Sequence, residues 1–124
     1  MTSQRGTGMS RAKQGRVVLV TCGSPKEARR IAGAVVKKRL VACVNFVQSP
    51  VESIYSWKGR VEKAREYLLV MKTTVARLTE LEREVKRLHG YELPEFIALP
   101  ISEGSASYFA WLSDSVAKPL RKGR

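Results

Sequence analysis

The sequence predicts an α+β fold with the element order β-α-β-β-α-β, an antiparallel sheet and an additional C-terminal helix. Three observations indicate it: a β-branched run at residues 17–22, two amphipathic helical segments, and a long extended region between those segments. With 124 residues, 44% of them hydrophobic, the chain has the length and composition of one domain that buries roughly two-thirds of its unfolded surface.

The first strand and helix have clear local signals. Residues 17–22 are continuously apolar or β-branched up to Cys22, as expected of a strand buried on both faces. Ser24, Pro25 and Glu27 then form a capping box with proline at the first helical position. The helix is expected to run to about Arg39, with an apolar stripe of Ala28, Ile31, Ala32, Val35 and Val36.

Residues 41–73 predict a long hairpin. Ser49-Pro50 interrupts the first strand, Lys58-Gly59 forms a tight turn, and the second strand covers residues 61–73. A strand of this length spans roughly 43 Å, whereas a domain of this size is only about 34 Å across. The tip, with Tyr55 and Trp57, is therefore expected to overhang the body, and another subunit is expected to cover it.

The remaining elements complete the order. Thr74 is expected to cap a second helix, which repeats apolar residues to Leu88 and has Gly90 as its C′ residue. Residues 96–99 predict a short buried strand, and a last helix follows Gly104-Ser105 and ends near residue 118. This order is that of the ferredoxin-like split βαβ fold.

The net charge of +12 is unevenly distributed. Residues 1–15 and 118–124 contain seven Lys and Arg and no acids, so we expect disordered basic tails around one domain at residues 16–117. That domain has a net charge of +5. Nucleic acid is therefore expected to bind only non-specifically, through the tails.

Two cysteines, Cys22 and Cys43, are too few for a disulfide framework. No apolar run reaches the roughly 18–20 residues of a membrane helix, and the N-terminus lacks the apolar core of a signal peptide. We therefore expect a cytoplasmic protein without membrane insertion, in which Cys43 packs in the core.

Several segments together resemble the CutA divalent-cation tolerance family over about residues 16–116. They are VLVTC (18–22), KRLVACVN (38–45), SIYSWKG (53–59), MKTT (71–74), HGYELPE (89–95) and YFAWL (108–112). The resemblance implies a homotrimer of the cytoplasm that serves tolerance of copper and other divalent metals. It also implies weakly bound copper, or another divalent ion, with Cys22, His89 and Glu95 as ligands.

The same residues have structural interpretations. Cys22 suits a small buried hydrophobe, His89 a cation at a helix C-terminus, and Glu95 a partner of a nearby base. Tyr55, Trp57 and Tyr91 suit a trimer interface better than a stacking site.

Catalysis is not expected, because Glu92 and Glu95 have no nucleophile or organised water beside them. Two alternatives remain: a trimeric sensor of a small anionic metabolite in intersubunit clefts, motivated by Lys72 and Arg30, and nucleic-acid association through the tails.

Overall fold

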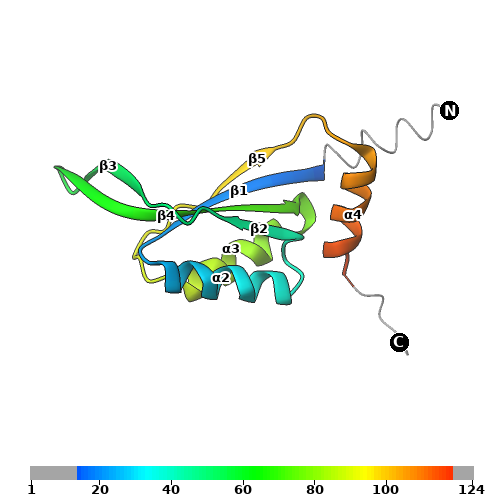
Figure 1. Ribbon diagram of the computed structural model, residues 1–124, viewed down its shortest axis with the longest axis horizontal. Coiled ribbons are helices and arrows are strands. Elements are labelled where there is room, and N and C mark those ends of the chain that lie inside the picture. The colour runs from blue at the N-terminus through cyan, green and yellow to red at the C-terminus, as the bar shows by residue number, and fades with distance from the viewer. Residues whose placement is uncertain (1–13, 119–124) are drawn as a thin grey trace.

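The computed structural model describes residues 14–118 (Figure 1). The predicted tails therefore lie almost entirely outside the described residues. The elements are β1 (Gly15–Cys22), α2 (Pro25–Lys37), β2 (Cys43–Phe46), β3 (Val51–Trp57), β4 (Arg60–Thr74), the 3-10 turn η1 (Val75–Arg77), α3 (Leu78–Leu88), β5 (Ile97–Pro100) and α4 (Ala106–Val116). No helix in this range is both long and apolar enough to cross a membrane.

The strands form one antiparallel sheet in the order β2-β4-β1-β5, with β3 pairing farther along β4. Helices α2 and α3 cover one face of this sheet, and α4 lies at the end opposite the hairpin tip (Figure 1). The predicted mixed α+β fold, with an antiparallel sheet and a C-terminal helix, is confirmed, and its order is ferredoxin-like.

The core lies between the sheet and the two helices that cover it. Both layers contribute fully buried side chains, which include Val18, Val20, Leu69 and Met71 from the sheet and Ile31, Val35, Leu81 and Val85 from the helices. Cys22 belongs to this cluster and is 0% exposed. The end of β1 is thereby fixed against the start of α2.

The β3–β4 hairpin projects beyond the body of the molecule (Figure 1). Lys58 and Gly59 both have positive φ, 53° and 79°, as a tight two-residue hairpin turn requires. Ile54 and Val61 on this arm are 59% and 77% exposed. The predicted long hairpin, its turn and the interruption near Pro50 are confirmed.

Three local predictions are wrong. Strand β5 is not buried: it lies at the edge of the sheet, with Ile97 and Leu99 nearly half exposed. Thr74 makes no side-chain capping bond, because a 3-10 turn precedes α3. Gly90 is not a left-handed C′ residue, since the chain leaves α3 through an extended His89 with φ −82° and ψ 143°.

Glu84 joins the two covering helices. Its carboxylate accepts from Lys38 Nζ at 2.8 Å, beyond the end of α2, and from Arg87 Nη2 at 2.7 Å on α3. These bonds lower the pKa of Glu84 from 4.5 to about 2. A carboxyl group with a lowered folded-state pKa stabilises the fold above its unfolded pKa and loses that contribution as pH falls.

We predict that Glu84→Gln lowers stability at pH 7 by about 1–2 kcal/mol, because the charge-assisted bonds to Lys38 and Arg87 weaken. Between pH 4.5 and 2, the parent should lose this advantage while the variant changes less. Denaturant unfolding across this pH range measures it, and Glu52→Gln on the exposed hairpin is the control. Parallel pH profiles for parent and Glu84→Gln would contradict the assignment.

Candidate metal centre

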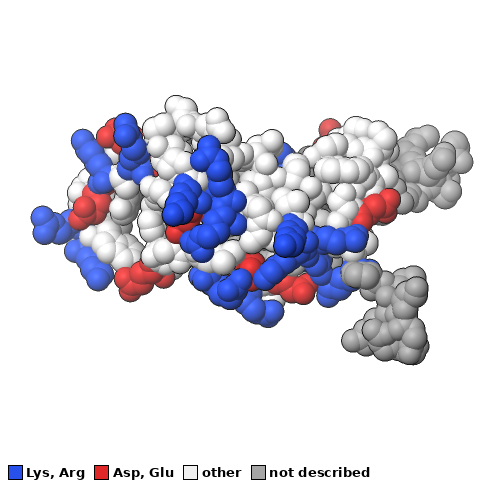
Figure 2. Space-filling view, turned by 60° about the horizontal axis from the view of Figure 1, so that its bottom comes forward, with Lys and Arg blue, Asp and Glu red and all other residues white. Residues whose placement is uncertain are grey.

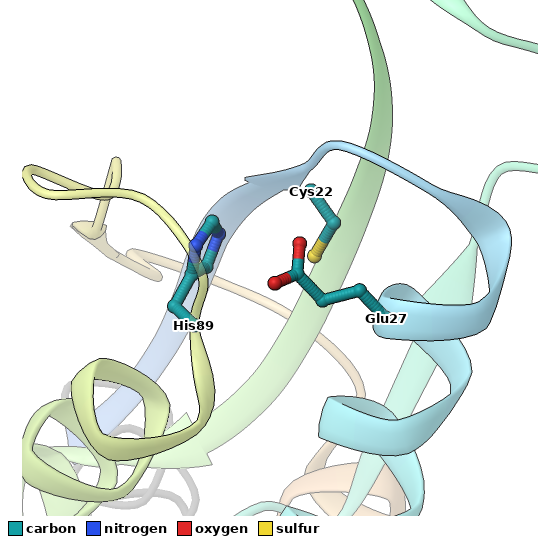
Figure 3. A group of neighbouring side chains, drawn as sticks. All are labelled: Cys22, Glu27 and His89. Atoms are coloured by element: carbon teal, nitrogen blue, oxygen red, sulfur yellow. The ribbon is translucent and has the colours of Figure 1, made fainter.

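Three potential ligands converge where β1 ends, α2 begins and the loop after α3 passes (Figure 3). The Sγ of Cys22, a carboxylate oxygen of Glu27 and a ring nitrogen of His89 all lie within 4.8 Å of one another. Cys22 is the last residue of β1, Glu27 is the third of α2, and His89 directly follows α3. The fold therefore brings together thiol, carboxylate and imidazole from three distant segments.

The start of α2 positions Glu27. Ser24 is the N-cap, and its hydroxyl accepts from the Glu27 backbone N–H at 3.1 Å. The Glu27 carboxylate turns back over the helix start: Oε1 accepts from Gly23 N–H at 3.2 Å and Oε2 from Gly90 N–H at 2.7 Å. One side chain thus ties the β1–α2 turn to the loop after α3.

His89 is held by both ring nitrogens. Nε2 lies 2.7 Å from the Thr21 carbonyl oxygen, and Nδ1 accepts from the Tyr91 backbone N–H at 3.1 Å. Because a carbonyl only accepts and an amide N–H only donates, this assigns the proton to Nε2 and the lone pair to Nδ1. The imidazole is therefore neutral, and its lone pair is occupied by a hydrogen bond.

The cysteine is held as a thiol. Burial raises the pKa of Cys22 to about 12, and the negative charges of Glu27 and Glu66 add to this effect, while Arg30 opposes it. A thiolate is the form that binds metals, so any cation must displace this proton.

Glu95, the carboxylate that the resemblance implies, does not lie in the group of three. It is half-buried in the loop and accepts from the Thr21 side chain. Burial and the charge of Glu66 raise its pKa, and the Thr21 bond partly offsets this rise. The structure thus brings Cys22 and His89 together with Glu27, whereas Glu95 contacts the side chain of Thr21.

Tyr91 covers the group from the loop. Its ring centroid is 4.7 Å from that of His89, and its hydroxyl hydrogen-bonds to the nearly buried Glu66. Burial, followed by this bond, raises the pKa of Tyr91. A Cβ added at Gly23 would lie 3.2 Å from the Tyr91 hydroxyl, so the turn passes close beneath the ring.

Of the predicted interface residues, Tyr55 and Trp57 lie in β3 on the hairpin arm. The Tyr55 side chain is 44% exposed, and Trp57 is half-buried. Tyr91 instead has contacts within its own chain.

Glu27 was not predicted as a ligand, because the capping box explained its presence. The sequence did contain a signal: an N3 carboxylate five residues after a strand-end cysteine can reach back to that strand.

The composition of the group suits a transition-metal ion, but its spacing is loose. Thiolate, imidazole and carboxylate bind Cu²⁺ or Zn²⁺ at about 2.0–2.3 Å, which places ligand atoms roughly 3.3–3.8 Å apart. Separations of up to 4.8 Å would have to shrink on binding. The residues present fit a weakly held divalent cation.

Comparisons with known proteins place this geometry in context. A family model described as "CutA1 divalent ion tolerance protein" matches residues 16–115. The chain is 48% identical over 99 residues to the divalent-cation tolerance protein CutA of Thermus thermophilus, which covers 80% of the chain and 95% of that protein.

It is also 42% identical to the chloroplastic protein CutA 1 of rice, of which it spans 55%. Among solved structures, the Thermus thermophilus divalent cation tolerance protein superposes with a TM-score of 0.81 at 46% identity, covering 83% of this chain and 99% of that one.

We predict that Glu27→Ala loosens the loop over Cys22 and lowers stability by about 1–2 kcal/mol, because the Gly23 and Gly90 N–H groups lose their acceptor. On a Cys43→Ser background, the Cys22 thiol should react with Ellman's reagent about tenfold faster than in the Cys43→Ser parent. Glu52→Ala, which removes an exposed hairpin carboxylate, is the control. Equal rates in all three proteins would show that Glu27 does not hold the loop.

Proposed function

Because this chain belongs to the CutA1 divalent ion tolerance family, we propose that it is a homotrimeric, non-catalytic protein of the cytoplasm that binds divalent cations weakly, copper among them. The single observation that supports cation binding is the convergence of Cys22, Glu27 and His89 within 4.8 Å. The cytoplasmic compartment is supported by two cysteines that are both free thiols.

Weak binding follows from what a cation must displace. It has to remove the Cys22 proton, replace the Tyr91 N–H at His89 Nδ1, and draw the three ligand atoms together. Each step opposes the intrinsic affinity of the ligand set. We therefore propose Cys22, Glu27 and His89 as the binding group, with Glu95 joining only if the loop moves.

Copper and zinc titrations of the variants should rank the ligands. We predict that His89→Ala and Glu27→Gln each weaken binding at least about tenfold, because each removes a donor. Glu95→Gln should change it less than about threefold. Isothermal titration under anaerobic conditions measures this, and zinc serves as the redox-inert probe.

Unchanged affinity in His89→Ala would remove His89 from the group. A larger loss in Glu95→Gln than in Glu27→Gln would restore Glu95 as the carboxylate ligand. Loss of binding in a correctly folded Cys22→Ser variant would separate thiol ligation from non-specific carboxylate binding.

The trimer proposal rests on the hairpin. We propose that residues 16–117 form one domain whose arm is covered by sibling chains, with Tyr55, Trp57 and Tyr91 near the contacts. Ile54 and Val61 on the arm and Ile97 and Leu99 on the edge strand β5 expose apolar surface that a lone subunit leaves in water.

We predict a sedimenting particle of about three times the chain mass of 13.9 kDa. The double variant Ile54→Lys and Val61→Lys should shift it toward the monomer, because buried charge without a partner destabilises an interface. Lys58→Gln at the turn is the control. A parent that sediments as one chain at micromolar concentration would exclude the trimer.

The anion-sensor alternative gains no support. Lys72 donates to Asn45 Oδ1, and Arg30 donates to the Leu88 carbonyl oxygen, so both cations that suggested it already have acceptors.

A further inference from the structure

The net positive charge of the domain is confined to its helical layer. Residues 25–39 and 75–89 hold ten Lys and Arg and four Glu, whereas the rest of residues 16–117 hold six Lys and Arg against seven acids. Figure 2, which brings the side of α2 and α3 forward, shows Lys and Arg gathered over this side, with Asp and Glu side chains beside some of them. We refer to this surface, defined by those two ranges, as the helical face.

Six of these ten cations have no carboxylate partner among the described residues, and one of the six, Arg39, donates to backbone carbonyl oxygens at the end of α4. Among the described residues, Lys26, Lys37 and Arg83 make no ion pair or hydrogen bond. Arg30 donates only to a backbone carbonyl, and Arg29 lies over the Phe46 ring at 5.1 Å. Of the four acids of the face, Glu80, Glu82 and Glu84 each pair with a cation, and Glu27 turns back to accept from the Gly23 and Gly90 N–H groups.

On α2 the free cations Lys26 and Lys37 share a stripe with Arg30 and Gly33. At 100° per residue, Lys26, Arg30, Gly33 and Lys37 lie within about 60° of one line along the helix. From Lys26 to Lys37 the stripe is about 16 Å long, at 1.5 Å per residue. Along a duplex axis, one strand has one phosphate per roughly 3.4 Å, so about five phosphates of one strand fall within this length.

Gly33 is an independent indication of a partner. It lies inside α2, is exposed, and has no positive φ that would require glycine. A Cβ added there would meet nothing within 4 Å, so packing within the chain does not require glycine either. Glycine in place of alanine lowers a helix's folding equilibrium about fivefold. Its absent side chain lets an external surface contact the helix backbone between Arg30 and Lys37.

The chemistry of the face selects among partners. Its exposed large apolar residues are only Val36 and Val75, and the exposed aromatic residues lie on the hairpin, the loop after α3 and α4. Protein interfaces need apolar or aromatic anchors, single strands need aromatic stacking platforms, and membrane-surface helices need an apolar face. A duplex phosphate backbone needs only suitably spaced cations.

We propose that the helical face binds the phosphate backbone of double-stranded nucleic acid, without reading base sequence. Lys26, Lys37 and Arg83 contact phosphates, and Gly33 allows the backbone to approach α2. This binding is independent of the cation site.

Two full-length triple variants with the same net charge test it. The face variant is Lys26→Gln, Lys37→Gln and Arg83→Gln. The control variant is Lys58→Gln, Arg60→Gln and Lys63→Gln, which removes three cations from the hairpin, where Glu52, Glu62 and Glu66 alternate with them. Fluorescence anisotropy with a labelled 24-base-pair mixed-sequence DNA duplex, and with the matching RNA duplex, reports affinity between 50 and 200 mM salt.

The face variant should lose at least about tenfold in affinity at 100 mM salt, and its slope of log K against log salt should fall by about 2.7. The control should lose less than threefold. Gly33→Leu should weaken duplex binding about threefold or more while leaving the circular dichroism spectrum and sedimentation unchanged. Whether DNA or RNA binds more tightly identifies the source of the duplex.

Equal losses in the two triple variants would overturn the proposal, because net charge or the terminal residues would then account for binding. Absence of binding to either duplex at 50 mM salt would also overturn it. So would a face variant that loses affinity for phosphatidylserine vesicles but keeps its duplex affinity. Unchanged affinity in Gly33→Leu would remove the helix-backbone contact.

Discussion

The Glu27 carboxylate is the contact on which the arrangement of the site depends. It accepts from Gly23 at the end of β1 and from Gly90 after α3, and it does so from the first turn of α2. Gly23 and Gly90 are distant in sequence, and the Glu27 bonds hold the loop after α3 together with the contacts of His89 to Thr21 and of Tyr91 to Glu66. The Glu27 bonds also place a negative charge at the positive end of the α2 dipole, where it is stabilised.

This contact also sets the limits of the chemistry. The groups best suited to bind a cation are those that hold the loop closed: His89 through Thr21 and Tyr91, and Glu27 through Gly90. A cation therefore competes with the fold for the same lone pairs. The cation binding proposed above is therefore weak, and the raised pKa of the buried Cys22 thiol weakens it further.

Local signals predicted most of the fold. The apolar run before Cys22, the capping box and the Lys58-Gly59 turn each determine their own structure, because their interactions span only a few residues. The wrong predictions concern features that depend on contacts distant in sequence. The apolar run of β5, for example, does not reveal whether the strand lies at the edge or in the centre of the sheet. His89 and Cys22 were candidates from the resemblance, whereas the position of Glu27 beside them depends on how the loop folds against α2.

Helix α2 contributes residues to both proposed activities, cation binding and duplex binding, from different sides of the helix. Glu27 turns back toward Cys22 beneath the loop, whereas Lys26, Arg30 and Lys37 line the outer stripe. Successive residues on a helix point about 100° apart, so neighbours in sequence such as Lys26 and Glu27 need not share a role. Gly33 belongs to the outer stripe, and a Cβ added there would meet nothing within 4 Å. Since glycine weakens the helix without a compensating contact inside the chain, the reason for its presence is to be sought outside the chain.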